Sequence, residues 1–153
     1  MSSTNQPLQA LEASIQLARQ NYKEAKIDSA LQHIKEGLQI DEHNAQLLEI
    51  AASTHLRFNN NNEAIKYAQE LITHHPRNPH GYSRYAQALL QQKQPFNANQ
   101  MALSGLQEAP HNQQLLALAS ESYQALERWD QSLELANQLI EFHPSLHMGY
   151  LKA

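Results

Sequence analysis

The chain has 153 residues, a length that favours one domain over two, and 41% of its residues are hydrophobic. It has no valine or cysteine but 22 leucines, 20 alanines and 19 glutamines, which favours helices over strands and excludes disulfides and thiolate metal sites. The net charge of −4 disfavours nucleic-acid binding, so we expect no nucleic-acid partner. The chain lacks both a secretory signal and an apolar run of about 18 residues. We therefore expect a cytoplasmic protein without a membrane partner.

The sequence repeats with a period of 34 residues. Prolines at positions 76, 110 and 144 are spaced by this interval, and Glu42, one period before Pro76, stands in a similar polar turn. We therefore divide the chain into a flexible tail at 1–7 and a repeat domain at 8–153. The domain comprises repeats at 11–44, 45–78, 79–112 and 113–146, with a partial fifth repeat at 147–153.

Each repeat is predicted to form two helices, A and B. In chain order we expect A at 8–22, B at 28–40, A at 45–57, B at 62–74, A at 79–91, B at 96–108, A at 113–125 and B at 130–142. A truncated ninth helix is expected in 147–153. The prolines follow the B helices because proline does not continue a helix.

Small residues recur at fixed positions of every repeat. Position 8 holds alanine or serine at 18, 52, 86 and 120, and position 20 holds them at 30, 64, 98 and 132. With the proline at position 32, this pattern resembles the tetratricopeptide repeat (TPR), over about nine-tenths of the chain. The resemblance implies an all-α, right-handed α-solenoid, in which the small residues let the two helices of a pair cross closely.

The turns between helices A and B depart from this pattern. The family's usual glycine is replaced by Ala25, Asn59, Lys93 and Glu127. Asparagine tolerates a left-handed backbone conformation, whereas lysine and glutamate are strained in it. We therefore predict that the turns at Lys93 and Glu127 adopt another geometry.

A weaker period of 68 residues overlies the first. Repeats two and four share nine identities, including His75 with His143 and Pro76 with Pro144, whereas repeats two and three share six. Chance among degenerate repeats and duplication of a two-repeat unit both account for this.

Catalytic and metal-binding patterns are weak. His74 and His75 are neighbours that point apart on a helix, and their spacing to His80 does not favour a metal site. The four glycines form no phosphate-binding loop, and Trp129 is expected to pack at the start of the last B helix. We expect neither catalysis nor a cofactor in this segment.

The resemblance implies a binding function on the concave face, where the A helices supply positions 2, 5, 6, 9, 12 and 13 of each repeat. The main candidates for a peptide-binding groove are Arg19, Lys23, Glu49, Ile50, Ser53, Arg57, His80, Arg84, Gln87, Leu118 and Glu121, and Tyr22, Leu56 and Gln91 occupy further such positions. Basic side chains outnumber acidic ones among these positions. We therefore expect a protein or peptide partner with a polar or mildly acidic segment, unless this face is only an ordinary solvated surface.

Two specific TPR functions fit poorly. A clamp for an acidic chaperone tail needs lysine and asparagine where this chain has Ile15, Arg19 and Ile50. The asparagine ladder of sugar-transferring TPR enzymes falls on Gln16, Ile50, Arg84 and Leu118. The resemblance leaves two alternatives open: an amino-terminal appendage of a bacterial sulfotransferase or glycosyltransferase, used for acceptor recruitment or dimerisation, and a free-standing secretion chaperone.

The carboxyl-terminal residues carry a separate prediction. Residues 147–153 supply about two helical turns, too few for a stable capping helix. We therefore expect the chain to be the amino-terminal part of a longer protein. An apolar surface at Leu133, Ala136 and Ile140, with Tyr150 and Leu151 beyond, predicts self-association through this end.

Overall fold

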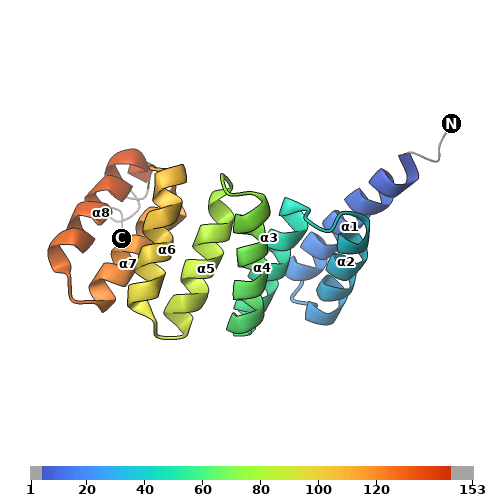
Figure 1. Ribbon diagram of the computed structural model, residues 1–153, viewed down its shortest axis with the longest axis horizontal. Coiled ribbons are helices and arrows are strands. Elements are labelled where there is room, and N and C mark those ends of the chain that lie inside the picture. Colours follow the sequence, from blue (N-terminus) through green and yellow to red (C-terminus); the bar gives the residue numbers. More distant parts are fainter. Residues whose placement is uncertain (1–4, 146–153) are drawn as a thin grey trace.

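Eight α-helices follow one another along the long axis of the molecule, as the computed structural model shows for residues 5–145 (Figure 1). They are α1 (Asn5–Lys23), α2 (Ile27–Ile40), α3 (Ala45–Arg57), α4 (Asn61–His74), α5 (Pro79–Gln91), α6 (Pro95–Glu108), α7 (Gln113–Ala125) and α8 (Trp129–Phe142). Residues 5–145 contain no strand, which confirms an all-α solenoid of four helix pairs. The predicted ninth helix and partial fifth repeat lie outside these residues.

The first helix begins earlier than expected. Helix α1 starts at Asn5 instead of residue 8, so Pro7 lies within its first turn. Proline is tolerated there because the first amide groups of a helix have no partner within the helix.

The A helices of the four repeats are α1, α3, α5 and α7. Asparagine side chains cap the last three of them. Asn44 accepts a hydrogen bond from the Leu47 amide, and Asn112 accepts one from the Leu115 amide, each at 3.0 Å. Asn78 accepts from the His80 amide at 2.9 Å, ahead of Pro79. These caps satisfy otherwise unpaired amides, so the asparagine that ends a repeat also begins the next A helix.

All four turns within the helix pairs adopt the left-handed conformation. The φ angles of Ala25, Asn59, Lys93 and Glu127 lie between 59° and 62°. The prediction of another geometry at Lys93 and Glu127 is therefore wrong. Each turn closes the preceding helix with two backbone hydrogen bonds; the Lys93 amide donates to the carbonyl of Leu90 at 3.0 Å, and the next amide donates to that of Leu89 at 2.9 Å. The closed helix end and the packing of the pair outweigh the strain at one residue.

The small residues lie where the two helices of a pair cross. The alanines at 18, 30, 52, 64 and 86 have no exposed surface. In the last pair, the Ser120 hydroxyl lies 3.0 Å from both the hydroxyl and the carbonyl oxygen of Ser132, which joins α7 to α8. The predicted close approach at these positions is confirmed.

Glycines in two B helices make room for leucines of the next A helix. A Cβ atom at Gly105 in α6 would lie 2.6 Å from Tyr82 Cβ and 2.8 Å from Leu115 Cδ1. At Gly37 in α2, the Cδ1 atom of Leu47 occupies the space of a Cβ atom. Leu47 and Leu115 are fully buried, so each glycine lets a leucine lock two repeats together.

Contacts among the described helices are confined to near neighbours. Each helix packs against the next one in the chain, and the A helices also pack against one another in the series α1, α3, α5 and α7. The core is accordingly divided into clusters along the solenoid. None of the helices within residues 5–145 combines the length and apolar character needed to cross a bilayer.

Candidate peptide-binding groove

Two adjoining hollows lie along α1, α3 and α5, and we call them together the A-helix groove. The first has a volume of about 270 Å³ and is lined by Tyr22, Ser53, Leu56, Arg57, Arg84, Gln87 and Gln91. The second, of about 200 Å³, is lined by Arg19, Tyr22, Lys23, Glu49, Ile50, Ser53 and Arg84. Tyr22, Ser53 and Arg84 are common to both hollows, so the groove runs across three successive repeats.

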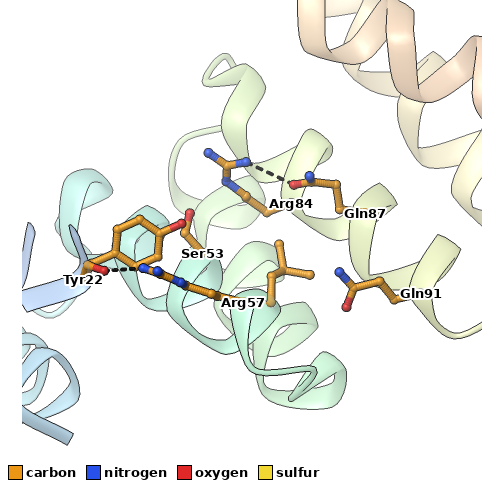
Figure 2. A pocket seen from close by; sticks show the side chains of 7 residues that line it. Tyr22, Ser53, Arg57, Arg84, Gln87 and Gln91 are labelled. Carbon is orange, nitrogen blue, oxygen red and sulfur yellow. Dashed lines mark hydrogen bonds between the residues drawn. The ribbon is translucent and has the colours of Figure 1, made fainter. Parts of the chain in front are cut away.

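Tyr22 and Arg57 form one wall of the first hollow. The Arg57 guanidinium donates a hydrogen bond to the Tyr22 carbonyl oxygen, and its carbon lies 5.3 Å from the centre of the Tyr22 ring. Figure 2 shows these two residues joined on one side and Arg84 joined to Gln87 on the other. The cation–π contact and the hydrogen bond hold the Arg57 side chain at the groove surface.

Arg84 lies at the centre of the groove. Its guanidinium donates to Gln87 Oε1 at 3.0 Å and to Glu49 Oε1 at 3.5 Å, while its Nε atom is buried without a hydrogen-bond partner among the described residues. Glu49 also lies 3.4 Å from Nδ1 of His80. Arg84 is therefore held in place by Gln87 and Glu49, and its Nε donor is shielded from solvent.

The charges of the groove are unbalanced. Four cationic side chains, Arg19, Lys23, Arg57 and Arg84, surround the single carboxylate of Glu49. Among the salt bridges of residues 5–145, only Arg84 of these four pairs with a carboxylate. Arg19 donates instead to the amide oxygen of Gln46 at 3.1 Å. The groove is thus a basic surface on a chain of net charge −4.

The structure brings most of the predicted residues together. Arg19, Lys23, Glu49, Ile50, Ser53, Arg57, Arg84 and Gln87 line the two hollows, and His80 lies beside Glu49. Leu118 does not line either hollow; its side chain is only 6% exposed and packs with Ala86, Ala102 and Ala119. Glu121 on α7 is exposed but does not line either hollow. The groove is consequently centred on the first three repeats.

A larger hollow of about 550 Å³ lies between α2, α3 and α4. Its lining is mainly apolar, with Leu31, Ile34, Leu38 and Tyr67 around the buried side chain of His55. The His55 ring stacks on Tyr67 with centroids 5.5 Å apart. Burial holds the pKa of His55 below its usual value, which favours the neutral imidazole. Lys35, Gln39 and Glu63 also line this hollow, so it combines an apolar wall with three polar side chains.

Sequence spacing missed a cluster of potential metal ligands. One donor atom each from His43, Glu70 and His74 lies within 4.8 Å of the other two. Glu70 and His74 are one turn apart on α4, whereas His43 belongs to the turn between α2 and α3. In the sequence, this cluster is indicated by the i, i+4 spacing of Glu70 and His74 together with His43 at the end of the preceding repeat.

An apolar stripe runs along α8. Trp129, Leu133 and Ile140 are 63%, 61% and 39% exposed, and Ala136 between them is half-buried. The expected packing of Trp129 is therefore wrong. The equivalent stripe of α4 includes Ile72, which a Cβ atom at Gly81 of α5 would touch at 2.9 Å. The stripe is thus the kind of surface that the next A helix covers in the inner repeats.

Comparison with solved structures identifies the fold of this chain. The TTC0263 structure from Thermus thermophilus, described as a thermophilic TPR protein, is 18% identical, with a TM-score of 0.77 over 88% of this chain and 75% of that one. The chain has the TPR fold. A MamA structure matches it with a TM-score of 0.79 and 13% identity over 90% of this chain and 81% of that one. Pseudomonas aeruginosa PilF matches with a TM-score of 0.81 and 18% identity over 90% of this chain and 63% of that one.

A transferase also contains this TPR fold. The structure of a Thermobaculum terrenum O-GlcNAc transferase mutant is 13% identical to this chain, with a TM-score of 0.71 over 77% of this chain but only 23% of that one. No protein-family model matches the chain, and no curated protein sequence matches it significantly. The likeness to these structures therefore concerns the fold, and the role of the groove follows from its own residues.

Proposed function

We propose that the chain is a non-catalytic protein-binding module that holds an extended acidic peptide, or an acidic segment of a partner domain, in the A-helix groove. The unbalanced charge of the groove carries this proposal. Arg19, Lys23 and Arg57 present cations that no described carboxylate neutralises, and Arg84, which pairs with Glu49, adds a fourth. A carboxylate placed between Arg57 and Arg84 gains charge-assisted hydrogen bonds that a neutral side chain does not.

The TPR fold supports a scaffold role, because its open solenoid presents a long continuous surface. The transferase-appendage alternative has only this fold in common with the O-GlcNAc transferase, so we do not adopt it. The groove contains paired cations instead of converging carboxylates or a nucleophile with a base, an arrangement that favours binding over catalysis.

A charge reversal in the groove tests this function. Fluorescence anisotropy with labelled peptides of one length but acidic, neutral or basic composition should show preferential binding of the acidic set. Arg57→Glu should weaken that binding by at least about tenfold, because it removes a cation and adds a repelling carboxylate at the same place.

Lys66 on α4 offers the matched control, since its side chain is exposed and does not line the groove. Lys66→Glu changes the net charge equally and should leave peptide binding within about twofold, as expected for an exposed charge outside the interface. Equal binding of acidic and neutral peptides, or equal losses in the two variants, would contradict the proposed function.

We further propose that the α8 stripe mediates self-association with a second copy of the chain. Trp129, Leu133 and Ile140 recur at intervals of four and seven residues and so share one helix face. Pairing of two such stripes about a two-fold axis would remove both from water.

A dimer that depends on concentration should appear in sedimentation velocity, and Leu133→Lys with Ile140→Lys should shift it to monomer. Replacing exposed Glu134 and Glu141 of the same helix with lysine is the control, and a wild-type monomer at all concentrations would refute this interface.

A further inference from the structure

The junction between the first two repeats brings three metal-binding side chains together. Oε2 of Glu70 lies 3.5 Å from Nε2 of His74 and 3.9 Å from Nδ1 of His43. Glu70 and His74 project from the last turns of α4, and His43 projects from the turn that closes the first repeat. All three side chains remain partly exposed to solvent.

The backbone around His43 is held by a second histidine. Nε2 of His75, the residue that caps the carboxyl end of α4, hydrogen-bonds to the carbonyl oxygen of His43. The His43 ring stacks on the His74 ring with centroids 3.5 Å apart and planes 17° apart. Its Nδ1 atom is buried and has no hydrogen-bond partner among the described residues. The fold therefore fixes this turn against α4 but leaves one potential metal-ligating nitrogen, Nδ1 of His43, without a partner within residues 5–145.

The chain contains its own comparison for this junction. Sixty-eight residues later, His111 stacks on Phe142 with centroids 3.8 Å apart, and Nε2 of His143 hydrogen-bonds to the His111 carbonyl oxygen at 2.7 Å. The ring stack and the histidine-to-carbonyl bond thus belong to the architecture of both junctions. At the second junction, however, Gln138 and Phe142 replace Glu70 and His74. The complete set of three potential metal ligands is therefore present only at the junction of the first two repeats, among the described residues.

We propose that His43, Glu70 and His74 bind a zinc ion that ties the end of the first repeat to α4 of the second. Two imidazoles and one carboxylate form a three-ligand set that zinc commonly uses, with water in the fourth position. Magnesium and calcium prefer oxygen ligands alone and are disfavoured here.

Zinc binding must rearrange the ring stack. The lone pair of an imidazole nitrogen lies in the plane of its ring, so two rings lying face to face do not direct their nitrogens at one ion. One ring has to turn about its Cβ–Cγ bond, and the partly exposed His74 side chain has room to do so. Loss of the stack on addition of zinc is therefore part of the proposal, and proton NMR of the histidine rings detects it.

The junction of the third and fourth repeats suggests a variant of the first junction that should still fold, because the same residues already occupy the equivalent positions there. Glu70→Gln with His74→Phe gives the first junction the residues of the second. In isothermal titration of the full chain with zinc chloride, after tag removal and chelator treatment, wild type should bind one equivalent. The double variant should bind it at least about tenfold more weakly, since even losing a group that only orients a ligand costs this much. Circular dichroism should show equal helicity for the two proteins.

The reciprocal variant and a histidine control complete the experiment. Gln138→Glu with Phe142→His should add a second equivalent of zinc at the junction of the third and fourth repeats. His33→Ala removes a histidine that pairs with Glu36 elsewhere on the surface and should leave the affinity unchanged. Equal zinc binding by wild type and the Glu70→Gln, His74→Phe variant would overturn the proposal, as would the absence of a second equivalent in the reciprocal variant. The peptide titrations are independent of this outcome.

Discussion

Replacing Leu47 with alanine is expected to lower the free energy of unfolding by about 2–5 kcal/mol. The side chain is fully buried and packs in one cluster with Ile15, Ile34 and Ile50, at the junction of the first two repeats. Its loss leaves a cavity that the rigid helix pairs fill only partly. Urea denaturation monitored by circular dichroism measures the change.

The same site provides a sharper test through Gly37. Alanine at position 37 gains about 1 kcal/mol of helix propensity, but its Cβ atom collides with Leu47, so Gly37→Ala should destabilise wild type by about 1–3 kcal/mol. In the Leu47→Ala background the colliding leucine atoms are gone and only the 3.2 Å contact with Ser14 Cβ remains, so the same substitution should cost much less or become neutral. A double-mutant cycle should therefore give a coupling energy above about 1 kcal/mol.

Gly105 is the matched control for this cycle. A Cβ atom there meets Tyr82 Cβ at 2.6 Å as well as Leu115 Cδ1. Because a Cβ atom cannot rotate away, Leu115→Ala should not rescue Gly105→Ala. Simple additivity at Gly37 and Leu47, or full rescue at Gly105, would show that the repeats shift apart to absorb the added methyl group.

Glycine at the three most strained turns is expected to stabilise the chain by about 2 kcal/mol in total. Ala25, Lys93 and Glu127 each have φ near 60°. Glycine relieves about 1–2 kcal/mol of strain at each site and loses about 0.5–1 kcal/mol through the greater freedom of the unfolded chain. The midpoint of thermal unfolding should rise by about 4–8 °C for a chain of this length.

Glycine in the interior of a helix is the control for that variant. Glu134 is exposed in α8, and Glu134→Gly should destabilise the chain by about 1 kcal/mol. If the triple glycine variant unfolds at or below the wild-type temperature, the left-handed turns are not strained by their side chains.

The helix boundaries followed from the repeat period because capping residues recur with it. The A helices at 45–57, 79–91 and 113–125 begin and end as predicted, each directly after an asparagine. The B helices at 62–74, 96–108 and 130–142 each begin one residue earlier than predicted. The turns at Lys93 and Glu127 do not follow from local strain, because the packing of the helix pair imposes the left-handed conformation on them.

The groove was less predictable than the fold. Position within the repeat placed Arg57 and Arg84 at the same hollow, but it did not distinguish Leu118, whose apolar side chain packs into the core. The cluster of His43, Glu70 and His74 escaped prediction because its members come from two repeats. Spacing within one helix reveals only one pair of such a set.

The neighbour-only packing of the helices also determines how the chain folds. Because the helices of residues 5–145 contact only those one or two places away, most of their contacts join residues close in sequence, which gives a low contact order. Little loop-closure entropy is then lost before contacts form, and folding starts wherever two adjacent helices first dock. Such a chain reaches its native state without a slow search for distant partners, and the A-helix groove takes shape progressively as successive repeats dock.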